Sequence, residues 1–245
     1  MRTVLVTSSL TFVPENYDRM VCEMASCDDV VGLIVLNNKK PKMILKALML
    51  MITMSAPRLG LTLLKNYFGS SSSRRRKAYI KTGKKIWNLE NINSLEAVKI
   101  ISDENIDLMI NSRTRFIYKE NILQSAKIGC INIHHGLLPE QRGLMCDFWA
   151  HLENNDYGFS IHQMTKKIDD GPILKVVNLG KPKNNYLDAI LAGSEIEAQA
   201  CKDIIEQIKK EGLISGQRNQ LTSVKYQKNP SLISGYKLQL KGIKV

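Results

Sequence analysis

Two polar side chains close an apolar run near the middle of the chain. The run covers residues 128–134 and ends on Asn132 and His134, and the loop GLLPEQRG follows it at 136–143. In a strand, alternate side chains share a face, so Asn132 and His134 point the same way. Their amide and imidazole N–H groups can hold an oxygen that gains negative charge, which is worth roughly 10²–10³ in rate per donor. The stretch therefore predicts a catalytic site.

A pair of carboxylates further along the chain could complete this site. Asp169 and Asp170 precede Gly171 in the segment IDDGPIL at 168–174. A carboxylate beside His134 would orient the imidazole and favour its protonated form, or would accept a proton through a water molecule. Such acid–base assistance is typically worth ~10²–10⁴ in rate. An aspartate before a glycine is also common in turns, and this is the alternative interpretation of Asp170.

Other kinds of site fit these residues less well. Neighbours on a strand face opposite ways, so His134 and His135 cannot readily bind one metal ion, and we expect no metal. The chain has no nucleophile elbow of the form G-x-S-x-G, and we interpret Cys130 as a small core residue. Neither a G-x-G-x-x-G motif nor a P-loop follows the first strand, which argues against a dinucleotide cofactor.

The net charge of the chain indicates that it attracts anions. Among its 245 residues, 35 Lys and Arg stand against 23 Asp and Glu, which gives a formal net charge of +12. Such a surface suits a polyglutamylated folate, a sugar diphosphate, nucleic acid or an acidic membrane, and charge alone does not choose among them. No aromatic residue lies within the basic run 74–77, so stacking on single-stranded nucleic acid is not favoured.

The cysteines and the N-terminal residues indicate the cellular compartment of the protein. Five cysteines form an odd set without C-x-x-C spacing, which disfavours both a disulfide framework and a zinc knuckle. Residues 1–10 read as a strand from the start and lack the features of a signal peptide. We therefore expect a cytoplasmic protein, and leave open a peripheral location at the inner face of the membrane.

Apolar runs alternate with helical patterns along most of the chain. Apolar runs separated by helices are typical of parallel strands buried on both faces. We therefore predict one open, mostly parallel α/β sheet flanked by helices, which is a Rossmann-like arrangement. Strands are expected at 3–8, 30–36, 85–89, 106–110, 128–134, 159–164 and 172–179. Helices are expected at 14–25, from 93 or 94, at 120–126, at 144–154 and at 187–210.

This alternation is interrupted between residues 41 and 80. The longest uncharged stretch there is about 11 residues, well short of the ~20 that span a bilayer. We interpret the segment as a helical insertion with a solvated basic loop at 70–77. A surface that contacts an anionic membrane, and an oligomer interface that would make a homodimer, remain open alternatives. We assign 1–180, with the insertion, to a catalytic domain, and 181–245 to a C-terminal helix and a loosely attached tail or hairpin.

The polar motifs closely resemble those of the formyltransferase family. The family is marked by an N-x-H strand end, L-L-P and R-G in the next loop, and a downstream D-x-G. These read here as Asn132-Ile133-His134, Leu137-Leu138-Pro139, Arg142-Gly143 and Asp169-Asp170-Gly171. The resemblance is strong over residues 80–179, weak over the first 36, and hardly extends to the insertion. It implies the formyltransferase fold and the transfer of a formyl group from 10-formyltetrahydrofolate to an amine.

The resemblance also implies roles for individual residues. It makes Asn132, His134 and Asp169 catalytic, because the family's aspartate stands two positions before the glycine, whereas Asp170 stands directly before it. The implied cofactor-binding residues are Arg115, Phe116, Ile117, Ile168, Asp170 and Gly171. The residues expected on the side of the amine substrate are His135, Arg142 and His162.

Differences between this sequence and the subgroups of the family indicate which amine is the substrate. Glycinamide ribonucleotide enzymes carry a glycine-rich phosphate loop after the first strand, where this chain has TSSLT at 7–11. Methionyl-tRNA enzymes add a sizeable C-terminal β-barrel, which is not evident here. The chain most resembles bacterial sugar N-formyltransferases, so we expect a nucleotide-linked amino sugar for a surface polysaccharide such as lipopolysaccharide. Methionyl-tRNA, another small amine, hydrolysis of the formyl donor, and a basic membrane-binding or nucleic-acid-binding module on an inactive scaffold remain alternatives.

Overall fold

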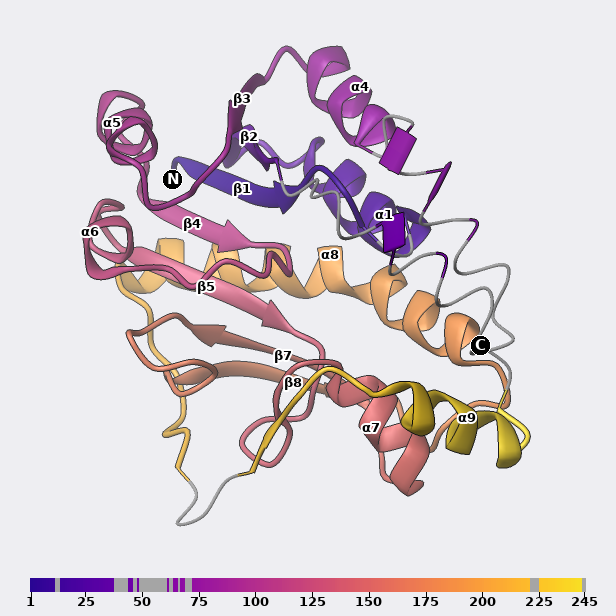
Figure 1. Ribbon diagram of the computed structural model, residues 1–245. Coiled ribbons are helices and arrows are strands. Elements are labelled where there is room, and N and C mark those ends of the chain that lie inside the picture. The colour runs from indigo at the N-terminus through magenta and orange to yellow at the C-terminus, as the bar shows by residue number, and fades with distance from the viewer. Residues whose placement is uncertain are drawn as a thin grey trace.

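A seven-stranded sheet forms the centre of the protein (Figure 1). The computed structural model describes residues 1–11, 14–37, 72–220 and 225–243, and a few positions between 44 and 68. The strand order is β3-β2-β1-β4-β5-β7-β8. Strands β1 to β5 pair in parallel, and β7 and β8 extend the sheet in antiparallel fashion. The expected open, mostly parallel α/β sheet is confirmed.

The elements lie close to the positions expected from the sequence. The strands of the large sheet are β1 Thr3–Ser8, β2 Val30–Leu36, β3 Lys85–Leu89, β4 Leu108–Asn111, β5 Gly129–His134, β7 Gly158–Gln163 and β8 Ile173–Asn178. A second, two-stranded sheet pairs β6 Arg142–Gly143 with β9 Tyr226–Gln227. The helices are α1 Pro14–Met24, α4 Ser73–Lys81, α5 Leu95–Asp103, α6 Glu120–Leu123, α7 Cys146–Glu153, α8 Tyr186–Glu211 and α9 Leu232–Leu240.

Helices cover both faces of the large sheet, which explains why its strands read as continuous apolar runs. On one face, Met20 of α1 and Ile205 of α8 belong to one core cluster with residues of β1, β4 and β5. On the other face, Ile101 of α5 and Ile122 of α6 pack in a second cluster. All four side chains are essentially inaccessible to solvent. The carboxyl ends of the parallel strands lie together at one edge of the sheet, where such sheets bind ligands.

Helix α8 is held at both ends by its caps. The side chain of Asn185 accepts hydrogen bonds from the backbone N–H groups of Leu187 and Asp188, and Gly212 ends the helix in the left-handed conformation. Between the caps, Ala198 and Cys201 are fully buried in the core that α1 and the sheet share. The C-terminal helix is therefore part of the main core, and a domain boundary at residue 180 stays a prediction.

The basic run 74–77 differs from the expected solvated loop. It lies in α4, where Arg75 is fully buried. Its guanidinium lies 3.1 Å from the Asp18 carboxylate and donates to Thr7 Oγ1 at 2.7 Å and to the Ser8 carbonyl at 2.8 Å. The expectation was wrong for Arg75 because Asp18 of α1 and polar groups at the end of β1 supply partners that no local pattern reveals. Most of the expected insertion lies outside the described residues.

The segment after α8 also differs from the loose tail or hairpin that we expected. It contains α9, whose Leu238 is fully buried against Phe148 of α7. The Trp149 indole N–H donates to the Lys228 carbonyl at 2.9 Å. These contacts attach the segment to α7, as Figure 1 shows. In the described parts of the chain, no helix is long and apolar enough to cross a membrane.

Candidate active site

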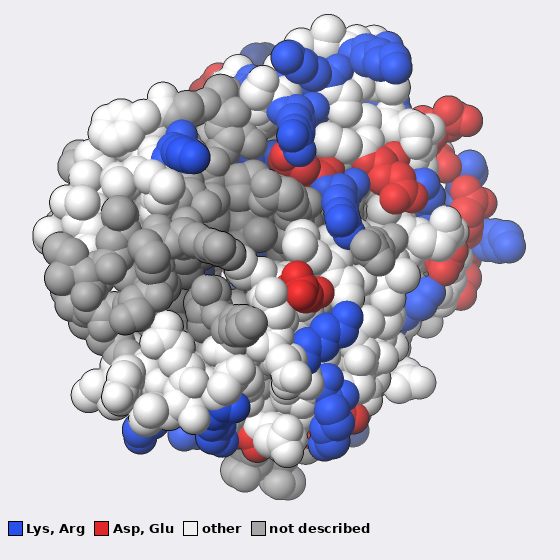
Figure 2. Space-filling view, turned by 90° about the vertical axis from the view of Figure 1, so that its right-hand side faces the viewer, with Lys and Arg blue, Asp and Glu red and all other residues white. Residues whose placement is uncertain are grey.

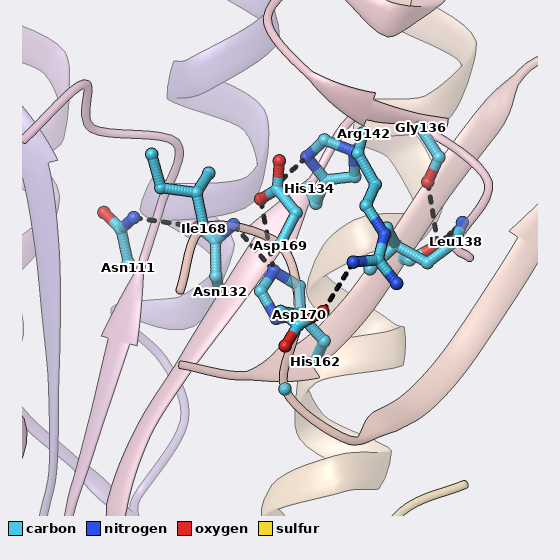
Figure 3. A network of polar contacts seen from close by, with 12 residues as sticks. Asn111, Asn132, His134, Gly136, Leu138, Arg142, His162, Ile168, Asp169 and Asp170 are labelled. Atoms are coloured by element: carbon cyan, nitrogen blue, oxygen red, sulfur yellow. Dashed lines mark hydrogen bonds and ion pairs between the residues drawn. The ribbon is translucent and has the colours of Figure 1, made fainter. Parts of the chain in front are cut away.

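The carboxyl ends of β4 and β5 bring polar side chains to one place (Figure 3). Asn132 and His134 end β5, and Asn111 ends β4 beside them. The antiparallel partner β7 places His162 directly opposite Asn132. Asp169, in the turn between β7 and β8, lies next to both imidazole rings. We call these five residues the polar cluster.

Hydrogen bonds fix the orientation of the Asn132 amide. Asn111 Oδ1 accepts from the Thr114 backbone N–H at 3.1 Å, so the Asn111 amide nitrogen faces Asn132 and donates to its Oδ1 at 2.8 Å. Asn132 Nδ2 then lies 3.1 Å from His162 Nε2. His162 Nδ1 lies 2.8 Å from the Gln163 carbonyl and must donate to it, which leaves Nε2 as an acceptor. The second hydrogen on Asn132 Nδ2 is available to a ligand.

His162 is held in its neutral form. Its side chain is almost fully buried, and this burial is the main reason why its pKa is lowered to about 4. The neighbouring His134 adds to the shift, because a positive charge on one ring disfavours a second on the other. A neutral ring is also what the hydrogen bond from Asn132 requires.

His134 and Asp169 face each other across the site. The Nε2 of His134 lies 2.7 Å from the Gln141 carbonyl and donates to it, so Nδ1 is the ring atom towards Asp169. Nδ1 lies 3.5 Å from Asp169 Oδ1, and the same oxygen lies 3.7 Å from His162 Nε2. Asp169 Oδ2 accepts from the Gly143 backbone N–H at 2.8 Å. Asp169 itself has a left-handed backbone, with φ of 49°.

Arg142 locks the turn that carries Asp169. Its guanidinium pairs with Asp170 Oδ1 at 2.6 Å and donates to Asn219 Oδ1 at 2.8 Å. The Asn219 amide in turn donates to the carbonyl groups of Asp169 and Gly171. Arg142 is almost fully buried, with its guanidinium shared among these partners. This geometry makes Arg142 and Asp170 a structural pair beside the polar cluster.

Gly136 is required by close packing around His134. A Cβ atom at this position would lie 2.6 Å from His134 Nε2 and 2.8 Å from the Gln141 carbonyl oxygen. The hydroxyl of Ser160 also donates to the Gly136 carbonyl at 2.7 Å and accepts from the Leu138 N–H at 2.9 Å. The loop 136–143 is therefore folded tightly back over the end of β5.

The residues expected on the cofactor side differ in how far they are exposed. Ile168 precedes Asp169 and is 51% exposed, and Ile117 is 66% exposed. The Arg115 guanidinium lies 3.8 Å from Met145 Sδ, next to the loop that contacts Asp169. Phe116 is half-buried against the α5–α6 core. Gly171 is buried at the foot of the turn, where a Cβ atom would meet the Gln163 carbonyl oxygen.

The residues expected on the substrate side separate into different places. His162 joins the polar cluster, as described above. His135 points away from that cluster: its Nε2 lies 2.6 Å from Glu197 Oε1 of α8, within a buried group of charges. Arg142 is enclosed by Asp170 and Asn219. The geometry thus leaves only His162 of these three on the face shared by Asn132 and His134.

Sequence reasoning missed several residues that build the site. Asn111 could have been noticed, because a polar residue ends the buried strand β4 at the ligand-binding edge. Asn219, Glu197 and Arg113 gave no comparable signal, since their partners come from distant parts of the chain. All five cysteines are free, and in the described ranges no group of His, Cys, Asp and Glu is arranged to hold a metal ion.

The charges on the site face are divided into separate groups. The arrowheads of β1, β4 and β5 point to the right in Figure 1, so Figure 2 looks onto their carboxyl ends. Lys and Arg side chains lie there in several groups around the face, with Asp and Glu between them towards one edge. Among the described side chains, this face does not present one continuous basic patch.

The fold and the polar cluster define a Rossmann-like α/β protein with a ligand site at the carboxyl edge of its sheet. Residues 64–180 match the family described as formyl transferase.

Curated relatives align with short parts of the chain. The bifunctional polymyxin resistance protein ArnA of Wigglesworthia glossinidia brevipalpis is 37% identical over 86 residues, which is 35% of this chain and 13% of that protein. A methionyl-tRNA formyltransferase of Blochmanniella floridana is 44% identical over 77 residues, which is 31% of this chain and 24% of that protein. The chain thus spans less than a quarter of the length of either relative.

Solved structures match over nearly the whole chain. A sugar N-formyltransferase from Shewanella sp FDAARGOS_354 superposes with a TM-score of 0.59 at 17% identity, covering 97% of this chain and 87% of that one. Glycinamide ribonucleotide transformylase 1 from Symbiobacterium toebii gives a TM-score of 0.60 at 16% identity, with 91% and 95% covered. At such identities the likeness concerns the fold alone.

Proposed function

We propose that this protein is an N-formyltransferase, which moves a formyl group from 10-formyltetrahydrofolate to an amine. One observation carries the proposal: the motif residues Asn132, His134 and Asp169 meet in one polar cluster at the carboxyl edge of the sheet. The family assignment of residues 64–180 supports the same reaction class.

The proposed roles follow from the donors and acceptors of the cluster. The folate supplies the formyl group when it is bound. The free hydrogen on Asn132 Nδ2 would hold the formyl oxygen as it gains negative charge. A proton between His134 Nδ1 and Asp169 Oδ1 makes their 3.5 Å contact attractive, because a bare ring nitrogen and a carboxylate repel each other. As the amine bonds to the formyl carbon, Asp169 would take up the proton that the amine loses. The bond from the formyl carbon to the folate nitrogen would then break, and tetrahydrofolate would leave with one proton gained on that nitrogen.

The rim of the site suits an aromatic co-substrate. Ile117 and Ile168 are exposed by 66% and 51%, and Leu144, next to the Gly143 that contacts Asp169, is exposed by 41%. Apolar side chains that stay exposed beside buried polar groups are typical of ligand sites. We therefore propose that the folate ring lies against these residues, with Arg115, Phe116 and Gly171 beside it.

We propose a nucleotide-linked amino sugar as the amine. The sugar N-formyltransferase from Shewanella shares the fold over nearly the whole chain, and a polymyxin resistance protein is among the relatives. The segment TSSLT at 7–11 also differs from the glycine-rich phosphate loop of glycinamide ribonucleotide enzymes. A cytoplasmic location fits the free cysteines.

Methionyl-tRNA is the second candidate amine. The supporting observation is the 44% identity with the methionyl-tRNA formyltransferase of Blochmanniella floridana over 77 residues. A tRNA would be bound largely through its phosphates, so its use should weaken steeply with salt, whereas a sugar nucleotide with few charges should respond much less.

The test is the release of tetrahydrofolate from 10-formyltetrahydrofolate with a panel of nucleotide-linked amino sugars, methionyl-tRNA, and no amine. We expect release only with an amino sugar, unchanged by excess chelator, and at least ~10²-fold slower in Asn132→Ala. Release without any amine would indicate a hydrolase instead. Absence of turnover with every amine would contradict the proposed function.

A further inference from the structure

Four charged side chains form a second buried cluster behind the polar cluster. Arg113 follows β4, His135 follows β5, Asp147 lies on α7 and Glu197 lies in the middle of α8. Glu197 is fully buried, and the side chains of Arg113 and Asp147 are less than a tenth exposed. We call these four residues the α8 charge cluster. Ionised side chains are rarely this buried unless they are paired.

Glu197 is the centre of the α8 charge cluster. Its Oε1 lies 2.6 Å from His135 Nε2, and its Oε2 lies 3.2 Å from Arg113 Nη2. Asp147 Oδ2 lies 3.6 Å from the other ring nitrogen of His135. One carboxylate of α8 therefore contacts the segments that leave both β4 and β5, which are the strands that carry Asn111 and Asn132.

The charge balance assigns the proton on His135. Its Nε2 also lies 2.8 Å from Arg113 Nη1, and one nitrogen cannot both donate to Glu197 and accept from Arg113. With a neutral His135, the cluster would hold two carboxylates against one guanidinium. With an imidazolium, it is neutral. The contacts with Glu197 and Asp147 outweigh burial and the nearby Arg113, so the pKa of His135 is raised, while the pKa values of Asp147 and Glu197 are lowered. Cys201 stays a thiol, because burial raises its pKa.

Two routes lead from this cluster to the polar cluster. Arg113 has a left-handed backbone with φ of 57°, an uncommon conformation for a residue other than glycine, which persists when the surroundings hold it. The next residue, Thr114, gives its N–H to Asn111, and Asn111 orients Asn132. The second route is covalent, since His135 directly follows His134.

We propose that Glu197 is a positioning residue: through Arg113 and His135, it holds the ends of β4 and β5 so that Asn132 and His134 keep their orientation. Nothing in this role requires Glu197 to touch a substrate. The inference about turnover rests on the proposed function, whereas the inference about orientation does not.

The first test measures orientation without turnover. Ring proton signals of the histidines are followed by NMR against pH in wild type, Glu197→Gln and Glu206→Gln, where Glu206 is an exposed glutamate of the same helix. In wild type, His135 should titrate above the ordinary value of about 6.5 and His162 well below it. In Glu197→Gln, the pKa of His135 should fall, because its nearest carboxylate is gone.

The response of His162 separates positioning from plain electrostatics. Removing a negative charge by itself lowers the pKa of a nearby histidine. If Glu197 orients Asn132, its loss weakens the hydrogen bond from Asn132 and admits water, so the pKa of His162 should rise instead. An unchanged or lowered pKa of His162 in Glu197→Gln, or a wild-type His135 that titrates at or below its ordinary value, would overturn the proposal.

The second test is turnover in the same proteins. Glu197→Gln should lower kcat by about 10- to 100-fold, since small displacements of catalytic groups have effects of this size. Glu206→Gln should match wild type. If Glu197→Gln does not fold, the double variant Glu197→Gln with His135→Gln, whose cluster is again neutral, replaces it. Wild-type turnover in a folded Glu197 variant contradicts the proposal, whereas an inactive wild type contradicts only the proposed function, because the titrations still test Glu197.

Discussion

The amide nitrogen of Asn111 donates to Oδ1 of Asn132 across 2.8 Å, and this contact decides which end of the Asn132 amide faces His162. Asn111 cannot rotate freely, because its own oxygen accepts from the Thr114 backbone. A buried residue thereby determines which atom of Asn132 can meet a ligand.

Asn111→Asp should therefore lower turnover while the protein stays folded. The carboxylate offers no donor to Asn132 Oδ1 and repels it, so the Asn132 amide should lose the orientation that it has in wild type. We expect kcat to fall by about 10²-fold, the size of effect seen when one oxyanion donor is lost. Asn121→Asp, on the exposed surface of α6, is the matched control and should leave kcat unchanged. Equal kcat values for the two variants would contradict the assigned orientation.

Substitution of Asp169 should mainly lower kcat, whereas substitution of Asp170 should mainly lower thermal stability. Asp169→Asn removes the carboxylate between two imidazoles, so kcat should fall by at least ~10² with little change in thermal stability. Alanine at Asn132 or His134 should have a similar effect on kcat. Asp170→Asn instead leaves the buried Arg142 without its ion-pair partner, so the melting temperature should fall more than kcat. The two aspartates are compared by turnover and by calorimetry, and the reverse pattern would assign the catalytic role to Asp170.

Substitution of Arg75 should lower the free energy of unfolding, whereas substitution of its exposed neighbours should not. Arg75→Gln breaks a buried ion pair with Asp18, and removing one partner of such a pair typically costs about 3–5 kcal/mol. Replacing the exposed Arg74 and Lys77 by Ser should leave the free energy of unfolding nearly unchanged. Urea unfolding compares the variants. The Arg74 and Lys77 variant also tests for contact with anionic vesicles at low salt, because it lowers the surface charge without disturbing Arg75.

The stability of the protein should fall in mild acid, in part because of His162. Its pKa is about 4 in the folded state and about 6.5 when unfolded, so between these values the unfolded chain binds more protons. The stability that comes from a neutral His162 is therefore complete above pH 6.5 and is lost as the pH falls towards 4. In His162→Gln, the melting temperature should depend less steeply on pH over this range. Identical slopes in the two proteins would show that folding does not lower the pKa of His162.

The local sequence pattern predicted the strands that are buried on both faces and the polar residues at which such strands end. The runs at 3–8 and 30–36 became β1 and β2, because nearly continuous burial leaves a mark along the whole strand. Strand alternation also placed Asn132 and His134 on one face. The face of His135 followed from the same rule, which argued against the substrate role that the family resemblance suggested.

The local sequence pattern could not predict the burial of residues whose partners are distant in the chain. Arg75 reads as one of four basic residues, and only Asp18 and the end of β1 make it a buried one. Glu197 reads as a polar position on an amphipathic helix. The segment around α9 was expected to be loose because it contains Pro230, Gly235 and Gly242, but Leu238 packs against apolar side chains of α7. In each case the deciding contact comes from tertiary structure.

Asn219 ties the turn at Asp169 to a part of the chain that lies beyond α8, 77 positions from Arg142. A fragment made of residues 1–180 would keep every motif of the family and most of the sheet, yet it would lack the amide that holds the Asp169 and Gly171 carbonyl groups. The motifs of such a fragment would still assign it to the family, although the fragment would be inactive in an assay. In gene fusions, split reporters or shortened expression designs, the minimal active unit should therefore be defined by this contact and not by the extent of the motifs.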